Sequence, residues 1–194
     1  TPTGGGGSYG NPDPTSGATG ANVFGYNLQG DYENNLNEMH LTTNSMNVSG
    51  HNNIHLQFSR YLNVEQPIYD HASISARGGI GGTWIQIWSN QSTIEDNQWQ
   101  TVSYDISGAI GSAPDIQIRW TMGETDGAWQ YSCWNIDDVQ LTTTTSSGID
   151  GDVNCDGVVN VTDVLDVVSN WGPCEGVCAQ DIVPDGTINV SDLL

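Results

Sequence analysis

The chain has 194 residues, of which 23 are Asp or Glu, three are Arg and none is Lys, so its formal net charge is −20. A surface this acidic repels nucleic acids and anionic membranes, which excludes both as expected partners. No apolar run approaches the roughly 18 residues of a membrane-spanning helix, so membrane insertion is excluded too. Because hard cations bind oxygen ligands, such a carboxylate-rich chain suits a calcium-rich medium outside the cell.

Residues 1–20, "TPTGGGGSYGNPDPTSGATG", are rich in Gly, Pro, Ser and Thr. This composition predicts a flexible leader, or an arm that becomes ordered on contact. Since the first residues are Thr-Pro rather than Met, we expect a processed or partial chain.

Residues 21–142 show short runs of alternating apolar residues between Gly, Asn and Asp turns, which is typical of β-strands. The residues that share one face of a strand are Ile54, Leu56 and Phe58; Ala72, Ile74 and Ala76; Val102, Tyr104 and Ile106; and Ile116, Ile118, Trp120 and Met122. No helical period is sustained in this stretch. The pattern predicts a mainly β fold, a jelly-roll β-sandwich.

Four tryptophans decide whether a sugar-binding surface is expected on this sandwich. Trp120 shares a face with isoleucines and is predicted in the core. Trp84 and Trp88 alternate with Gln86, so that face is either exposed or turned inward. Trp129, in "ETDGAWQYS", is the best candidate for an exposed loop aromatic in contact with a carbohydrate.

A polar linker at 143–149 precedes a small module at 150–194, in which one unit occurs twice at an offset of 29 residues. Each copy has the form D-x-x-x-D-G-x-x-N-V-[TS]-D, and the first is followed by apolar residues at helical spacing. These residues are Val161, Val164, Leu165, Val168 and Trp171. The module is therefore predicted to contain an α-helix after its first loop.

Both copies carry the oxygen donors of an EF-hand-type calcium loop. In the first loop the ligands are Asp152, Asn154, Asp156, the carbonyl of Val158, Asn160 and Asp163. In the second they are Asp181, Asp185, Thr187, Asn189 and Asp192. Position 3 of the second loop is Val183, which offers no side-chain oxygen, so we expect weaker calcium binding there.

A loop with Asp at position 12, an exiting helix and a second copy about 30 residues on resembles the type I dockerin module of secreted bacterial proteins. The second repeat is degenerate and its helix incomplete. The resemblance implies a β-sandwich partner of the cohesin type.

"VFGYNLQGDY" and "WNIDDVQL" resemble the MAM-like, adhesin-type calcium-binding jelly rolls of secreted bacterial proteins. That resemblance implies a calcium ion between the N-terminal segment and the last strand, with Asp31 and Asp137 or Asp138 as ligands. The alternative is that these aspartates accept hydrogen bonds from backbone N–H groups.

Three of the four cysteines lie in the acidic module, which indicates an oxidising compartment. The sequence favours a Cys174–Cys178 disulfide, with Cys133 and Cys155 free or bonded to each other. Spacing alone leaves all three pairings open.

We expect no enzyme, because the four histidines form no H-E-x-x-H helix and no G-x-S-x-G motif is present. The favoured function is a calcium-stabilised structural or adhesive protein at a bacterial surface. It would assemble head-to-tail with copies of itself or with a cohesin-like sandwich. The alternative is a carbohydrate- or protein-binding accessory region of a secreted hydrolase, docked to a cohesin scaffold.

Overall fold

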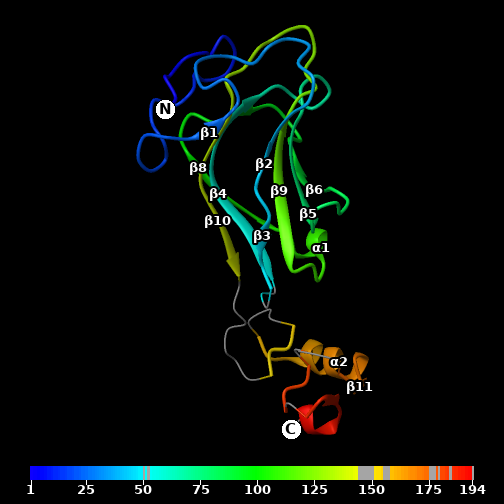
Figure 1. The fold of residues 1–194 in the computed structure, drawn as a ribbon. Helices are drawn as coiled ribbons and strands as arrows, with labels where there is room; N and C mark the ends of the chain where they lie inside the picture. The colour runs from blue at the N-terminus through cyan, green and yellow to red at the C-terminus, as the bar shows by residue number, and fades with distance from the viewer. Residues whose placement is uncertain are drawn as a thin grey trace. The chain divides into compact units, whose positions relative to one another are not determined.

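The computed structural model describes residues 1–49, 51, 53–143, 151–154, 158–174, 178, 180–183 and 185–193. The chain divides into two compact units, Thr1–Thr143 and Thr144–Leu194. The first unit holds two antiparallel sheets, and Figure 1 shows them face to face.

Sheet A contains β1 (Phe24–Gly25), β10 (Cys133–Thr143) and β4 (Ile54–Val64) side by side. The other edge of β4 pairs with β8 (Gln100–Asp105) and, at its end, with β7 (Ile94–Glu95). Sheet B has the order β2-β9-β5-β6, and β3 also pairs with β9. Its strands are β2 (Met39–Thr42), β3 (Met46–Asn47), β5 (Ala72–Gly78), β6 (Ile85–Ser89) and β9 (Asp115–Met122). One helical turn, α1 (Ser107–Ile110), joins β8 to β9.

The chain passes from one sheet to the other at most of its connections. β1 and β4 belong to sheet A, β2, β3, β5 and β6 to sheet B, β7 and β8 to sheet A, β9 to sheet B and β10 to sheet A. The resulting orders, β1-β10-β4-β8 and β2-β9-β5-β6, are those of a jelly roll. The predicted mainly β, jelly-roll class is therefore confirmed.

The core lies between the sheets and consists of the inward residues of each strand. On β9, Ile116 and Ile118 are fully buried, and Trp120 is only 3% exposed. The predicted faces of β4 and β5 are also buried, while Val102 and Tyr104 of β8 are half-buried against the same core. Period-2 alternation thus located the core because each sheet has one face turned to the other.

A bulge between β5 and β6 settles the orientation of the paired tryptophans. Ser75 pairs with Gln86 and the preceding residue, Ile74, pairs with Trp88, so β6 carries one extra residue, Ile87. The extra residue reverses the alternation. Trp88 therefore packs against the core, and Trp84 stays on the outer face with Gln86.

The N-terminal segment packs against its own sandwich. Backbone hydrogen bonds join Thr3 N to Leu28 O (3.1 Å) and Asp13 N to Gly5 O (2.8 Å). The amide of Asn11 donates to Asn63 Oδ1 (2.9 Å) in β4. Of the two expectations for residues 1–20, the structure supports the arm that is ordered by contact. This arm covers the outer face of the end of β4, where alternation stops and consecutive residues are buried.

The second unit is small and centres on α2 (Val161–Ser169), the helix predicted after the first loop. Asn160 caps it and forms a capping box with Asp163, which satisfies N–H groups at the helix start. The other elements are β11 (Gly172–Pro173), β12 (Thr187–Ile188) and η1 (Val190–Leu193). Val153, Val167 and Ile188 form its core with the half-buried Cys174 and Cys178. The apolar residues that predicted the helix are largely exposed: Val161, Val164, Leu165, Val168 and Trp171.

Candidate metal centres and binding surfaces

Three carboxylates meet at one end of the sandwich. Glu65 follows β4, Asp70 precedes β5, and Asp126 lies between β9 and β10. Their ligand atoms all lie within 4.8 Å of one another, and among the described residues no other group of three His, Cys, Asp or Glu side chains is as close. Glu65 and Asp70 are buried, and Asp126 is half-buried.

The protein holds two of these carboxylates in place and leaves the third without a donor. Asp70 Oδ1 accepts a hydrogen bond from the amide of Asp126 (2.9 Å), and Tyr32 Oη donates to Asp70 Oδ2. Asn90 Nδ2 donates to the carbonyls of Glu65 (2.9 Å) and Asp70 (3.0 Å). Glu65 is 3% exposed, and its carboxylate accepts no hydrogen bond from the described residues, although its oxygens are not among the fully buried atoms without a partner.

Burial and mutual repulsion disfavour the charged form of this cluster. Burial raises the pKa of Glu65, and the charges of Asp70 and Asp126 raise it further. Burial also raises the pKa of Asp70, against the lowering effect of its hydrogen bonds. An all-oxygen set without His or Cys fits a hard cation such as calcium. The bare carboxylate of Glu65 is the observation in favour of that fit.

The sequence did not single out this cluster. Glu65 and Asp70 are separated by the loop after β4, and Asp126 is 56 residues beyond Asp70. In a chain with 23 acids, such a combination cannot be recognised from spacing. The one available signal is that Glu65 directly follows a strand whose last residues are buried.

The aspartates that the MAM-like resemblance implied as ligands are hydrogen-bonded to the arm. Asp31 accepts from the amides of Gly7 (2.7 Å) and Ser8 (3.2 Å). Asp137 Oδ2 accepts from the amide of Thr19 (3.2 Å), and Asp138 Oδ1 from the Thr19 hydroxyl (2.5 Å). The contacts of Asp31 and Asp137 correspond to the alternative of backbone N–H donors, whereas Asp138 accepts from a side chain. Calcium at these residues stays a prediction.

The junction between the arm and β10 contains one further acid, Asp13, which is 2% exposed. Its Oδ1 accepts a hydrogen bond from Asn135 Nδ2 (2.7 Å). Asp13 Oδ2 and Asn135 Oδ1 are both buried without a partner in the described part of the chain. Burial raises the pKa of Asp13 to about 7. The site therefore favours a protonated acid.

The described parts of the two loops predicted to bind calcium share one hydrogen-bond pattern. In the first loop, Asp163 accepts from the amides of Asn154 (3.2 Å) and Asn160 (2.8 Å). In the second, Asp192 accepts from the amides of Val183 (2.9 Å) and Asn189 (2.8 Å). These bonds join positions 3 and 9 to position 12 in both copies.

Backbone donors lower the pKa of both position-12 acids, chiefly the amide of Asn160 for Asp163 and that of Asn189 for Asp192. The two acids are thus ionised at neutral pH. Of the other expected ligands, Asp152 is buried, and the side chain of Asp181 accepts from the amides of Asp185 and Gly186. Thr187 N donates to Asp185 Oδ1 (2.9 Å). Asp156 and Cys155 lie outside the described residues, so part of the first loop is untested.

The expected disulfide between Cys174 and Cys178 is present. It closes a short loop beside the core of the second unit. Cys133 is a free thiol at the start of β10 and is fully buried. Burial raises the pKa of this thiol far above its usual range.

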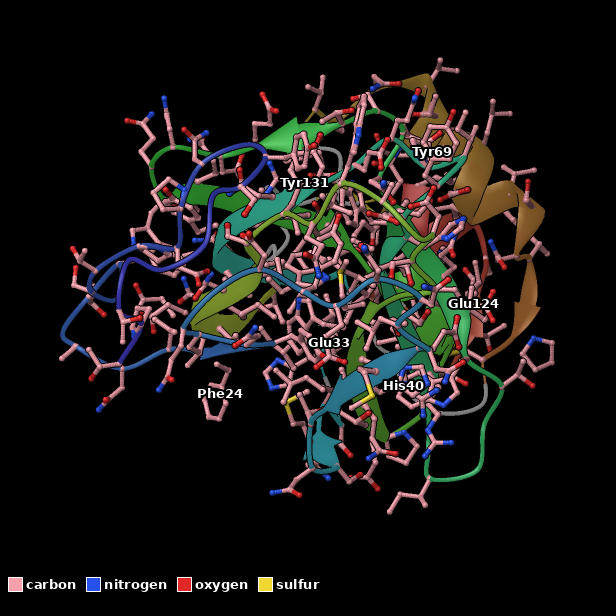
Figure 2. All side chains as sticks on the ribbon, turned by 90° about the horizontal axis from the view of Figure 1, so that it is seen from above. Phe24, Glu33, His40, Tyr69, Glu124 and Tyr131 are labelled. Carbon is pink, nitrogen blue, oxygen red and sulfur yellow. A yellow bond between two sulfur atoms is a disulfide. The ribbon has the colours of Figure 1, made fainter. Side chains whose placement is uncertain are left out.

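Trp129 is exposed, as expected, with 52% of its surface accessible. Tyr9 from the arm stacks on it at a ring-centroid distance of 5.4 Å and an interplanar angle of 18°. Tyr9 also contacts Tyr131, which is labelled in Figure 2, with centroids 6.0 Å apart. The arm therefore contributes half of an exposed aromatic pair, which sequence reasoning did not foresee.

Two apolar cavities adjoin at the open edge between β1 and β2. They have volumes of about 160 and 300 Å³, and both are lined by Leu41, Trp120 and Ile136. Phe24 borders the larger one and is 67% exposed, and Figure 2 shows its side chain pointing away from the sheets.

No protein-family model matches the chain, and no curated protein matches it. Among solved structures, the chain is similar to one described as "EclA C-terminal domain; sugar-binding protein". The TM-score is 0.38 and the identity 11%, over 66% of this chain and 88% of that chain. A similarity at this level gives no information on function. The MAM-like and dockerin-like resemblances stay predictions. In the part of the chain that the structure describes, no helix is long and apolar enough to cross a membrane.

Proposed function

We propose that this chain is a non-catalytic structural or adhesive protein that works outside the cell and is stabilised by calcium. The observation that carries this proposal is the meeting of Glu65, Asp70 and Asp126, whose ligand atoms lie within 4.8 Å of one another with Glu65 and Asp70 buried. A buried charge without a partner is costly, and a bound divalent cation removes that cost. The Cys174–Cys178 disulfide supports an oxidising, extracellular location.

Calcium at this cluster would connect three separate segments of the sandwich: the end of β4, the start of β5 and the loop before β10. A ligand that binds only the folded state adds roughly 2.7 kcal/mol of stability at 100 times its Kd. The dockerin-like loops would add calcium sites in the second unit, with the first loop stronger than the second because Val183 replaces a ligand.

Thermal unfolding of the full chain tests the proposal. With calcium replacing chelator, we expect the wild-type midpoint to rise by several degrees. In Glu65→Gln, the increase in midpoint caused by calcium binding to the sandwich should be absent. Glu33→Gln, a change at an exposed acid, should keep it. A wild-type midpoint that is the same in calcium and in chelator would contradict the proposal.

Assembly through protein contacts is the second part of the proposal. Its support is the exposed apolar face of α2 and the apolar edge beside Phe24, two unlike surfaces on one chain. Contacts between unlike surfaces propagate unless the rotation closes. The partner is a second copy or a cohesin-like sandwich. Sedimentation at high concentration is expected to show larger species in millimolar calcium than in chelator, and a monomer under both conditions would refute self-assembly.

The alternative function, a carbohydrate-binding accessory region of a secreted hydrolase, is favoured by the exposed Trp129–Tyr9 pair. Exposed aromatic rings stack on the apolar faces of sugars. Binding on a glycan array that is lost in Trp129→Ala, and kept in an Ile80→Ala control at another exposed apolar side chain, would support it. The same glycan signal in both variants would exclude a role for this pair.

A further inference from the structure

Two of the three arginines converge on one tryptophan on the outer face of sheet B. Arg77 in β5 and Arg119 in β9 place their guanidinium carbons 4.5 and 4.0 Å from the centre of the Trp84 ring. Ser75, which pairs with Arg119 on one side and Gln86 on the other, belongs to the same outer face. The bulge that turns Trp88 inward leaves Trp84 on this face.

Neither arginine is neutralised by the protein. Among the described residues, the only arginine in a salt bridge is Arg60, whose Nε lies 2.9 Å from Asp96 Oδ2. Like charges at Arg77 and Arg119 oppose each other, and burial together with the charge of Arg77 lowers the pKa of Arg119. The charge of Glu38 acts on Arg119 in the opposite sense, but no carboxylate of the described residues lies within salt-bridge distance of either arginine. In a chain with 23 acids, an arginine pair without a salt bridge points to an anion from outside the chain.

The contacts of the two guanidinium groups fix their orientation and leave donors open. Arg77 donates from Nε (3.0 Å) and Nη2 (2.6 Å) to Gln117 Oε1, and Gln117 Nε2 donates to Thr43 O (2.9 Å). Arg119 donates from Nε to Thr42 Oγ1 (3.3 Å). Within the described part of the chain, its two terminal nitrogens have no hydrogen-bond partner. Stacking on Trp84 holds the guanidinium plane, whose N–H edge matches a carboxylate.

A polar groove of about 610 Å³ lies near this pair, although neither arginine lines it. Its lining includes the polar residues Ser73, Gln86, Ser89 and His71 and two acids, Glu38 and Glu124. Gln86 is common to both regions, because it lines the groove and pairs with Ser75 beside Arg119. Hydroxyl, amide and imidazole groups are hydrogen-bond partners for sugar hydroxyls.

We infer that the outer face of sheet B binds a carboxylate-bearing saccharide. The uronate carboxylate lies on Arg119 with Arg77 beside it, and the neighbouring sugar occupies the groove from Gln86 to Glu124. An uninterrupted polyanion fits less well, since the net charge of −20 repels it over the whole surface. This inference deepens the proposed adhesive role by naming the ligand class, and it is independent of the calcium cluster.

Isothermal titration of the full chain in calcium tests the inference with three probes. They are a glucuronate-containing tetrasaccharide, the same tetrasaccharide with its carboxyls methyl-esterified, and a hexa-aspartate peptide. We expect the acid to bind at least about tenfold more tightly than the ester, because charge-assisted bidentate bonds are lost in the ester. Arg119→Gln should weaken binding of the acid by about the same factor, and Arg77→Gln by less.

Trp171→Ala is the matched control, since it removes an exposed tryptophan of the second unit and should leave this affinity unchanged. Near-UV circular dichroism of each variant verifies that the fold is intact. Equal binding of acid and ester, or full affinity in Arg119→Gln, overturns the inference. Equal binding of the hexa-aspartate peptide overturns the saccharide assignment. All three results leave the calcium proposal untouched, because that depends on the midpoint shift lost in Glu65→Gln.

Discussion

Asp13 in the N-terminal arm accepts a 2.7 Å hydrogen bond from Asn135 in β10, although 122 positions separate the two residues in the chain. Both side chains are buried, and one oxygen of each has no partner among the described residues. Both of these oxygens are acceptors, so neither can donate to the other while Asp13 is ionised. A proton on Asp13 would supply the missing hydrogen-bond donor. The arm is thus joined to the last strand through Asp13, a carboxylic acid whose pKa is raised when the protein folds.

The raised pKa of Asp13 predicts a pH-dependent stability. The folded-state pKa is about 7, whereas an unfolded Asp titrates near 3.9. The folded state therefore binds this proton more tightly, so its contribution is complete below about pH 4 and is lost as the pH rises through 7. In chelator, the free energy of unfolding should fall by up to about 4 kcal/mol over that range from this group.

Urea unfolding at pH 5 and pH 8 measures this effect. Asp13→Asn, which resembles the protonated acid, should reduce the difference between the two pH values and be the more stable protein at pH 8. Asp138→Asn, at an exposed aspartate, should behave as wild type. The same pH difference in Asp13→Asn and wild type would contradict the prediction.

Asn63 is predicted to hold the arm on the sandwich. It is fully buried, and its side chain accepts from the amide of Asn11 (2.9 Å) and donates to the carbonyl of Asp96 (3.1 Å). Asn63→Ala leaves both groups without this partner, so we expect a loss of about 1–3 kcal/mol and faster proteolytic cleavage within residues 1–20. Asn44→Ala is the exposed control, and equal cleavage rates in the two variants would refute the role of Asn63.

The jelly-roll sandwich was predictable because its two sheets each have one face buried, so that Ile116, Ile118 and Trp120 recur with period 2. Trp84 and Trp88 were not separable, because one extra residue at a bulge reverses the alternation and leaves no clear mark in the sequence. Glu65, Asp70 and Asp126 meet only through the topology of the fold. The loops of the second unit were recognisable, since their donors follow one another within 12 residues.

Restoring the missing ligand in the second loop should strengthen its calcium site. Val183 stands at position 3, where its amide already donates to Asp192 Oδ1 (2.9 Å). Val183→Asp adds a carboxylate at a ligand position, and we expect about tenfold tighter binding, or ~1.4 kcal/mol. Ile182→Asp adds the same charge at a position without a ligand role. Calcium titration of both variants tests this prediction. An equal increase in calcium affinity in the two variants would show that the added charge alone is responsible.

The buried thiol of Cys133 should be inert in the folded protein. It is fully buried, and its raised pKa keeps it protonated at neutral pH. In a Cys155→Ser background, where Cys133 is the single thiol outside the disulfide, iodoacetamide labelling followed by mass spectrometry should proceed only at the rate of unfolding. Rapid labelling under native conditions would show that the start of β10 opens on its own.

The position of β10 determines how the sandwich would bear a pulling force. This strand lies between β1 and β4, and its last residue, Thr143, pairs with Ile54 just before the chain enters the second unit. Tension from that unit would run along the strand and load its hydrogen bonds with β4 together, in shear, rather than one after another. The contacts of Asn135 and Asp137 with the arm would add resistance in the same direction. The order of strands thus predicts that β10 resists a pull on its C-terminal end.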